Sequence, residues 1–190
     1  MRFPELNPAR LALSLVLPQE PPTLGFSHRG KVLGYPASLV KLFYLVATHA
    51  QLEARRLTPS KELSKALSAM IERSSNDATS LVVDLLSETT SGPAPEPVAL
   101  RRWLGRRESV NRYFAAWRCP EFAGIHLVQK TWSEAPYGRE WQSCYEVADN
   151  RNGSAQMRSP FCCLRSRAAK WSAAGARRQC WRSWPAFRIA

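Results

Sequence analysis

The chain has 190 residues, of which 45% are hydrophobic, and it carries a formal net charge of +12. This length is sufficient for one globular domain with a core of its own, and the hydrophobic fraction excludes a wholly disordered chain. No apolar run approaches the roughly 20 residues that a membrane-spanning helix requires, so we expect a soluble protein without a membrane span.

Near the N-terminus lies a short apolar stretch from Leu11 to Leu17. Glu5 and two prolines precede it and no small-residue cleavage site follows, which is unlike a signal peptide. We interpret the stretch as a strand, and we expect a cytoplasmic location only by default. A second segment, "GKVLGYP" (30–36), predicts another strand, and the Pro-rich "PQEPPTLG" (18–25) between them predicts a hairpin or two neighbouring strands.

The first predicted helix runs from about Ala37 to Arg55. Its apolar side chains surround it nearly completely, which is typical of a buried central helix and places Lys41 in or near the core. Ser38 lies one turn before Lys41, so the amine can reach the hydroxyl, and a lysine whose pKa is lowered by burial can take a serine proton. Alternatively, Ser38 caps the helix while Lys41 extends to water, and the spacing alone is expected by chance.

Two more helices are predicted next. The segment 61–73 has apolar side chains at i, i+3, i+4, i+7 and i+8, an amphipathic pattern, and "TSLVVDLL" (79–86) continues a third helix. Ser74, Ser75 and Asn76 lie at the junction between these helices, where side chains can face a cleft. The alternative is that Ser75, Asn76 or Asp77 only caps the third helix. Further along, 89–97 predicts a loop and 98–117 a helix.

The C-terminal segment from Gly153 to Ala190 differs from the rest in composition. It contains seven Arg, one Lys and no acidic residue, so eight of the twelve net positive charges lie in it. It is either a basic interaction arm or a C-terminus read out of frame after a nucleotide insertion or deletion, and we favour the second. We expect it to be disordered or poorly packed. The five cysteines of the chain form no C-x-x-C spacing, so we expect no metal, cofactor or disulfide framework.

The order of the helical motifs resembles that of the class A β-lactamase-like serine hydrolases, within the serine β-lactamase and penicillin-binding-protein superfamily. "SLVK" (38–41) matches the family's Ser-x-x-Lys at the start of a buried helix. "SSN" (74–76) matches its Ser-Asp-Asn between two helices, with Ser75 replacing the aspartate. The resemblance covers residues 9–152. It implies an α/β (α+β) fold in which a helical subdomain lies beside an antiparallel sheet, here incomplete.

The resemblance also implies roles for individual side chains. Ser38 is acylated, Lys41 takes part in proton transfer, Ser74 passes a proton to the leaving nitrogen, and Asn76 holds Lys41 and the substrate amide. The family's third signature, Lys-Thr-Gly on a strand lining the cleft, is absent, because "VQKTWSEAP" (128–136) has Trp in place of Gly and comes too early. That stretch is similar instead to the loop bearing the deacylating acid, which makes Glu134 the candidate general base.

These observations predict a partial catalytic domain, 1–152, followed by an atypical tail, 153–190. The predicted function is a serine hydrolase that opens β-lactam amides, with activity impaired or absent because the third signature is missing. We expect a small-molecule substrate, a β-lactam or cell-wall peptide amide, no specific nucleic-acid partner and a monomeric chain. Two alternatives remain: an amidase or esterase of the D-Ala-D-Ala peptidase kind, and a catalytically dead protein whose basic arm binds nucleic acid or membranes.

Overall fold

The computed structural model describes residues 7–16, 25–30, 32–119, 122, 124–147, 150 and 154–155. The chain divides into two compact units, Leu33–Ser154 and a second formed by Met1–Val32 with Ala155–Ala190. Apart from residues 154 and 155, the basic tail lies outside the described residues, so its predicted disorder stays a prediction.

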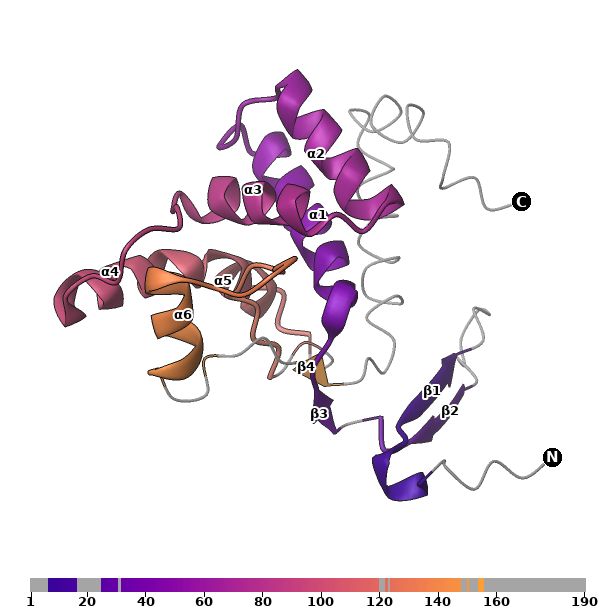
Figure 1. Cartoon of the computed structure of the whole chain (residues 1–190). Coiled ribbons are helices and arrows are strands. Elements are labelled where there is room, and N and C mark those ends of the chain that lie inside the picture. Colours follow the sequence, from indigo (N-terminus) through magenta and orange to yellow (C-terminus); the bar gives the residue numbers. More distant parts are fainter. Residues whose placement is uncertain are drawn as a thin grey trace. The chain divides into compact units, whose positions relative to one another are not determined.

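The described part of the chain contains six α-helices and four short strands, so the predicted mixture of helix and sheet is confirmed (Figure 1). The strands are β1 (Leu13–Val16), β2 (Gly25–His28), β3 (Leu33–Gly34) and β4 (Ser154–Ala155). The helices are α1 (Val40–Glu53), α2 (Lys61–Glu72), α3 (Asn76–Ser87), α4 (Pro97–Arg107), α5 (Ser109–Ala115) and α6 (Gly138–Tyr145), with short 3-10 turns η1 (Pro8–Arg10) and η2 (Ala37–Leu39). No helix in this described part is long and apolar enough to cross a bilayer.

The predicted N-terminal hairpin exists, but its second strand was wrongly placed. β1 pairs antiparallel with β2, in a register that runs from Leu13 opposite His28 to Val16 opposite Gly25. Among the described residues of the segment 30–36, only β3 is a strand, and it pairs with β4. The sequence "GFSH" of β2 contains a single large apolar residue, so it lacks the alternation that marks a strand in a sequence.

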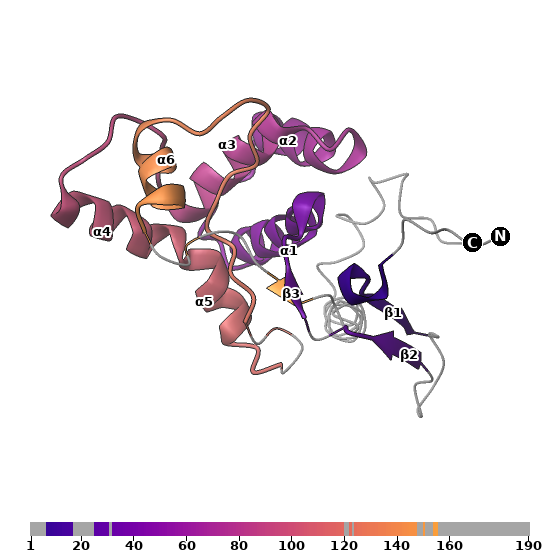
Figure 2. The ribbon, with the colours of Figure 1, turned by 60° about the horizontal axis from the view of Figure 1, so that its bottom comes forward.

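Helix α1 is the centre of the helical unit, as its apolar composition predicts. It contacts α2, α3 and α5, and Figures 1 and 2 both show α2 and α3 close to it. Phe43 of α1 is fully buried and packs edge-to-face against Phe114 of α5, with ring centroids 5.1 Å apart. Such aromatic pairs add about 0.5–1.5 kcal/mol beyond the area that they bury. The core therefore fixes the helix whose first turn carries Lys41 and which directly follows the 3-10 turn of Ser38.

Helices α2 and α3 meet at a tight junction. Ser60 caps α2 by accepting a hydrogen bond from the Leu63 amide. Two residues after α2 ends at Glu72, Ser74 lies in the left-handed region, with φ of 53°. Ser75 then caps α3, because its Oγ accepts from the Ala78 amide at 3.2 Å. The capping alternative therefore applies to Ser75, and the side chains on either side of it, Ser74 and Asn76, have other partners.

The second half of the helical unit departs from the predicted pattern in two places. The predicted helix 98–117 is two helices, α4 and α5, separated at Glu108. Helix α6, which the sequence did not predict, packs against α4 (Figure 2). Its buried residues are the polar Glu140 and Ser143, while Trp141 and Tyr145 are exposed. This helix buries polar side chains and exposes aromatic ones, the reverse of the usual amphipathic pattern. The periodicity of apolar residues therefore did not predict it.

Candidate active site

Four of the five predicted site residues come together where the start of α1 meets the α2–α3 junction. The amine of Lys41 donates hydrogen bonds to Ser74 Oγ at 2.8 Å, to Asn76 Oδ1 at 2.9 Å, and to the backbone carbonyl of Ser74. It also lies 3.4 Å from Ser38 Oγ. The hydroxyl of Ser74 donates to Ser38 Oγ at 3.0 Å. Residues up to 38 positions apart in the chain thus surround one amine.

Lys41 is buried and does not extend to water. Its relative exposure is 3%, whereas Ser38 and Ser74 are exposed, so the amine lies beneath the two hydroxyls. Burial lowers the pKa of Lys41 below its ordinary value of 10.5, because removal from water disfavours the charged form. Neither η2 nor α1 has a side-chain cap, so Ser38 is not a capping residue. The structure therefore excludes both a capping role for Ser38 and a Lys41 side chain that extends to water.

The left-handed conformation of Ser74 accompanies its double contact with Lys41. A non-glycine residue with positive φ costs roughly 1–3 kcal/mol and persists only where the surroundings hold it. Here both the carbonyl oxygen and the side-chain hydroxyl of Ser74 bind the Lys41 amine. The residue before Ser38, Ala37, also has a positive φ, of 46°. A left-handed backbone conformation thus occurs at one of the two serines, Ser74, and at the residue before the other, Ser38.

The amide of Asn76 bridges Lys41 and the segment that follows Val128. Its Nδ2 donates to the backbone carbonyl of Trp132 at 2.9 Å, while its Oδ1 accepts from Lys41. Since the Trp132 carbonyl can only accept, this bond fixes which end of the amide faces the lysine. Lys41 therefore meets an oxygen, not an amide NH₂.

An open pocket of about 390 Å³ adjoins this cluster. Part of its wall is apolar: Met70 and Ile71 come from α2, Leu39 from η2 and Leu42 from α1. Its remaining lining residues include Ser38, Lys41 and Ser74. A small molecule held in this pocket would therefore lie against both serines and an apolar wall, and a mostly apolar lining with a few polar groups is typical of ligand sites.

Glu134 is not joined to this cluster by any contact. It is exposed, in the segment between Trp132 and α6, and makes no hydrogen bond or ion pair with any of the described residues. The neighbouring contacts that tie this segment to α3 are the Asn76–Trp132 bond and a long contact, 3.5 Å, from Ser133 Oγ to Asp77. The role of Glu134 as a base stays a prediction.

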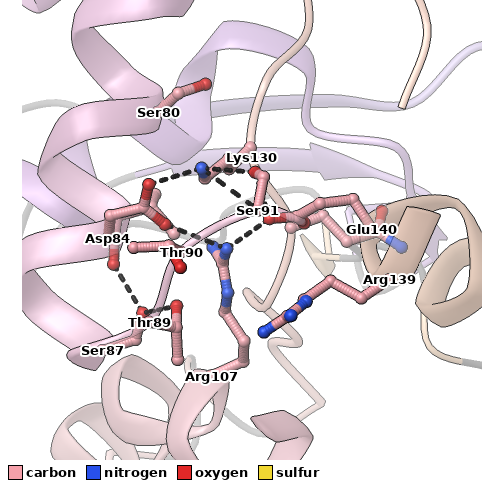
Figure 3. Close-up of polar contacts among 12 residues, drawn as sticks. Ser80, Asp84, Ser87, Thr89, Thr90, Ser91, Arg107, Lys130, Arg139 and Glu140 are labelled. Atoms are coloured by element: carbon pink, nitrogen blue, oxygen red, sulfur yellow. Dashed lines mark hydrogen bonds and ion pairs between the residues drawn. The ribbon is translucent and has the colours of Figure 1, made fainter. Parts of the chain in front are cut away.

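A second polar cluster, which the sequence did not predict, lies nearby in the protein interior (Figure 3). Arg107 of α4 binds both Glu140 of α6 and Asp84 of α3, and Lys130 binds Asp84. The side chains of Arg107 and Glu140 are 0% and 1% exposed. Burial raises the pKa of Glu140, and the neighbouring Arg107 opposes that shift. Nothing in the local sequence pairs these charges with one another, because they lie in separate segments of the chain and meet only when α3, α4 and α6 pack together.

Among the described residues, no group of three His, Cys, Asp or Glu side chains is arranged to hold a metal ion. Comparison of the chain with protein-family models, with curated proteins and with solved structures found no match. The case for a function therefore rests on the geometry of the site itself.

Proposed function

We propose that this protein is a serine hydrolase of the class A β-lactamase type, with Ser38 as nucleophile and Lys41 as its base. One observation carries the proposal: a buried lysine amine contacts two exposed serine hydroxyls and an asparagine amide at the edge of a pocket. A serine hydroxyl becomes an effective nucleophile when an adjacent base removes its proton, and a lysine with a lowered pKa can be that base. The arrangement of Ser38 and Lys41 supports this chemistry.

The partners of Lys41 direct its lone pair. A neutral amine has two N–H groups and one lone pair, and both the Ser74 carbonyl and Asn76 Oδ1 can only accept. When these two oxygens hold the two N–H groups, the lone pair is left for a serine hydroxyl. Because hydroxyl protons rotate freely, the protonation state of Lys41 decides whether each serine hydroxyl donates or accepts its hydrogen bond.

The distances favour transfer of the Ser38 proton through Ser74. The direct path from Ser38 Oγ to the Lys41 amine is 3.4 Å, at the long end for a hydrogen bond, whereas the two steps through Ser74 Oγ are 3.0 and 2.8 Å. In the proposed step, Ser38 Oγ attacks the amide carbonyl and its proton passes through Ser74 to Lys41. The C–N bond then breaks, Ser74 returns a proton to the leaving nitrogen, and an ester on Ser38 results.

The proposed substrates are β-lactams or related cell-wall amides. Their opening at Ser38 is tested by incubating the protein with a fluorescent penicillin and measuring intact mass and labelled peptides. We expect an adduct on Ser38 that is absent in Ser38→Ala and present in the matched control Ser64→Ala, an exposed serine of α2. If the wild type forms no Ser38 adduct, this chain does not have the proposed activity.

The same experiment separates hydrolase from amidase chemistry. An adduct that forms and then disappears as penicillin is consumed supports a β-lactamase-like cycle. A stable adduct supports a penicillin-binding amidase or esterase of the D-Ala-D-Ala peptidase kind. Time points taken after a single addition of penicillin, until it is consumed or its concentration stops falling, distinguish the two.

A further inference from the structure

Helix α3 holds three consecutive residues of the 130–132 segment through a single stripe of side chains. Asn76, Ser80 and Asp84 follow one another at intervals of four residues and so lie on one side of the helix. The Asn76 amide donates to the Trp132 carbonyl at 2.9 Å, and Ser80 Oγ donates to the Thr131 carbonyl at 3.3 Å. Lys130 completes the series by its ion pair with Asp84.

Lys130 is the strongest of these anchors. Its amine donates to Asp84 and to Ser91 Oγ at 2.7 Å, and it lies 3.7 Å from Glu140, while its side chain is 5% exposed (Figure 3). A buried ammonium is tolerated only with such compensation, and removal of one partner from a buried ion pair is strongly unfavourable. The position of the 130–132 backbone is therefore fixed more firmly by Lys130 than by the single hydrogen bond from Ser80.

The backbone fixed in this way acts on the Lys41 site through Asn76. The Trp132 carbonyl accepts from Asn76 Nδ2 and thereby keeps Oδ1 directed at the Lys41 amine. If the carbonyl moved away, the amide could rotate by half a turn and place its NH₂ group against Lys41. That arrangement would pair two donors and would compete for the lone pair that takes the Ser38 proton.

We propose that Lys130 is a positioning residue for the Ser38–Lys41 pair. It acts through the Trp132 carbonyl and the Asn76 amide, and it touches neither the nucleophile nor the pocket. This role rests on the proposed function for its effect on catalysis, whereas its effect on Asn76 can be measured without any substrate.

The test uses the full chain in the wild type, in Lys130→Met and in Lys65→Met, a matched control on the exposed face of α2. NMR reports the solvent exchange of the Asn76 side-chain amide protons, assigned by their loss in Asn76→Ala. We expect Lys130→Met to speed this exchange by about tenfold or more, because a side-chain hydrogen bond that opens more often protects less. It should also slow Ser38 acylation, whereas Lys65→Met should change neither quantity.

Two further variants show whether a loss of Asn76 protection comes from the lost ion pair or from misfolding. Lys130→Arg keeps the cation and should restore most of the amide protection. If Lys130→Met does not fold, Asp84→Asn removes the partner charge while keeping the shape of the side chain, and the same loss of Asn76 protection is expected. A folded variant that lacks the ion pair but retains wild-type protection of Asn76 would overturn the proposal.

The two proposals fail in different ways. If the wild type forms no Ser38 adduct, the proposed function is wrong, and the exchange rates still show whether Lys130 orients Asn76. If the adduct forms and Lys130→Met slows it without changing Asn76 exchange, the proposed function stands, but Lys130 does not act through Asn76.

Discussion

Two buried lysines in the helical unit have opposite surroundings. Lys130 lies among charges of the opposite sign, with Asp84 as its direct partner and Glu140 close by. Lys41 is equally inaccessible, yet its hydrogen bonds go to neutral oxygens of Ser38, Ser74 and Asn76. Burial among neutral acceptors favours loss of the proton, whereas pairing with a carboxylate favours keeping it.

This difference separates a lysine that can act as a base from one that holds a structure. A base must be able to lose its proton near neutral pH, and the pKa of Lys41 is lowered by burial. Lys130, in contrast, is paired with Asp84 and anchors the 130–132 segment. The two lysines are similarly buried, so the groups around each amine, and not burial alone, distinguish the lysine proposed as a base from the one proposed as an anchor.

The largest expected effect is on catalysis. Lys41→Met removes the base but keeps a long apolar side chain, so the rate of Ser38 acylation by penicillin should fall by about 10²–10⁴-fold. Thermal melting should still show a cooperative transition, because no ion pair of Lys41 is broken. Lys65→Met is the control and should acylate at the wild-type rate. Wild-type acylation by a folded Lys41→Met protein would show that Lys41 is not the base.

Next in size is an effect on stability at the other cluster. Arg107→Met removes the more deeply buried of the two cations that Glu140 and Asp84 share, and the free energy of unfolding should fall by about 3–5 kcal/mol. Urea denaturation measures this loss, with Arg101→Met, on the exposed side of the same helix, as the control. A loss no larger than that of the control would mean that the buried cluster contributes little.

The pH dependence of stability should reveal the lowered pKa of Lys41. Between that lowered value and 10.5, the ordinary value, the folded state binds fewer protons than the unfolded state. Stability contributed by this group therefore rises with pH across the window and is constant below it. We expect the unfolding free energy of the wild type to rise relative to that of Lys41→Met as pH approaches 10.5. A constant difference would argue against a shifted pKa.

A smaller effect is expected at Ser75, which lies between the candidate site residues Ser74 and Asn76. Ser75→Ala removes the cap of α3 and should lower the unfolding free energy by about 1 kcal/mol. Its side chain does not contact Lys41. The change in the activation free energy of Ser38 acylation should therefore be smaller than the loss of unfolding free energy. A large loss of acylation with little loss of stability would assign Ser75 a part in the chemistry.

The smallest expected effect is that of Glu134→Gln on acylation. Because Glu134 is exposed and makes no contact with Ser38, Lys41, Ser74 or Asn76, the rate of adduct formation should stay within about twofold of the wild type. Single-turnover acylation measures this rate. Release of the adduct is the separate readout: slower release would assign Glu134 to water activation, and unchanged release would exclude it.

The same contrast explains how far the sequence could predict the structure. Helices α1 and α2 have apolar patterns that reflect burial, so their extents and the burial of Lys41 were predictable. The meeting of Ser38, Lys41, Ser74 and Asn76 could be inferred only from the order of motifs and their resemblance to a family. The left-handed turn at Ser74, which places both of its oxygens on Lys41, has no signal in the sequence.

The second cluster could not be predicted because its charges are compensated only in three dimensions. Arg107 lies among other arginines on α4, and Glu140 lies on α6, whose exposed face carries Trp141. A pattern based on hydrophobicity assigns such charges to the surface and such an aromatic to the core. Only the packing of α3, α4 and α6 brings the opposite charges together and makes their burial tolerable.

The pH–rate profile of Ser38 acylation, with the modified residue identified by peptide mapping, tests whether Ser38 and Lys41 are nucleophile and base. We expect the modification to map to Ser38 and its rate to rise with pH through an inflection below 10.5, as Lys41 loses its proton. In Lys41→Met the residual rate should lack this inflection. Modification at another residue, or the same inflection in both proteins, would contradict the assignment of Ser38 and Lys41 as nucleophile and base.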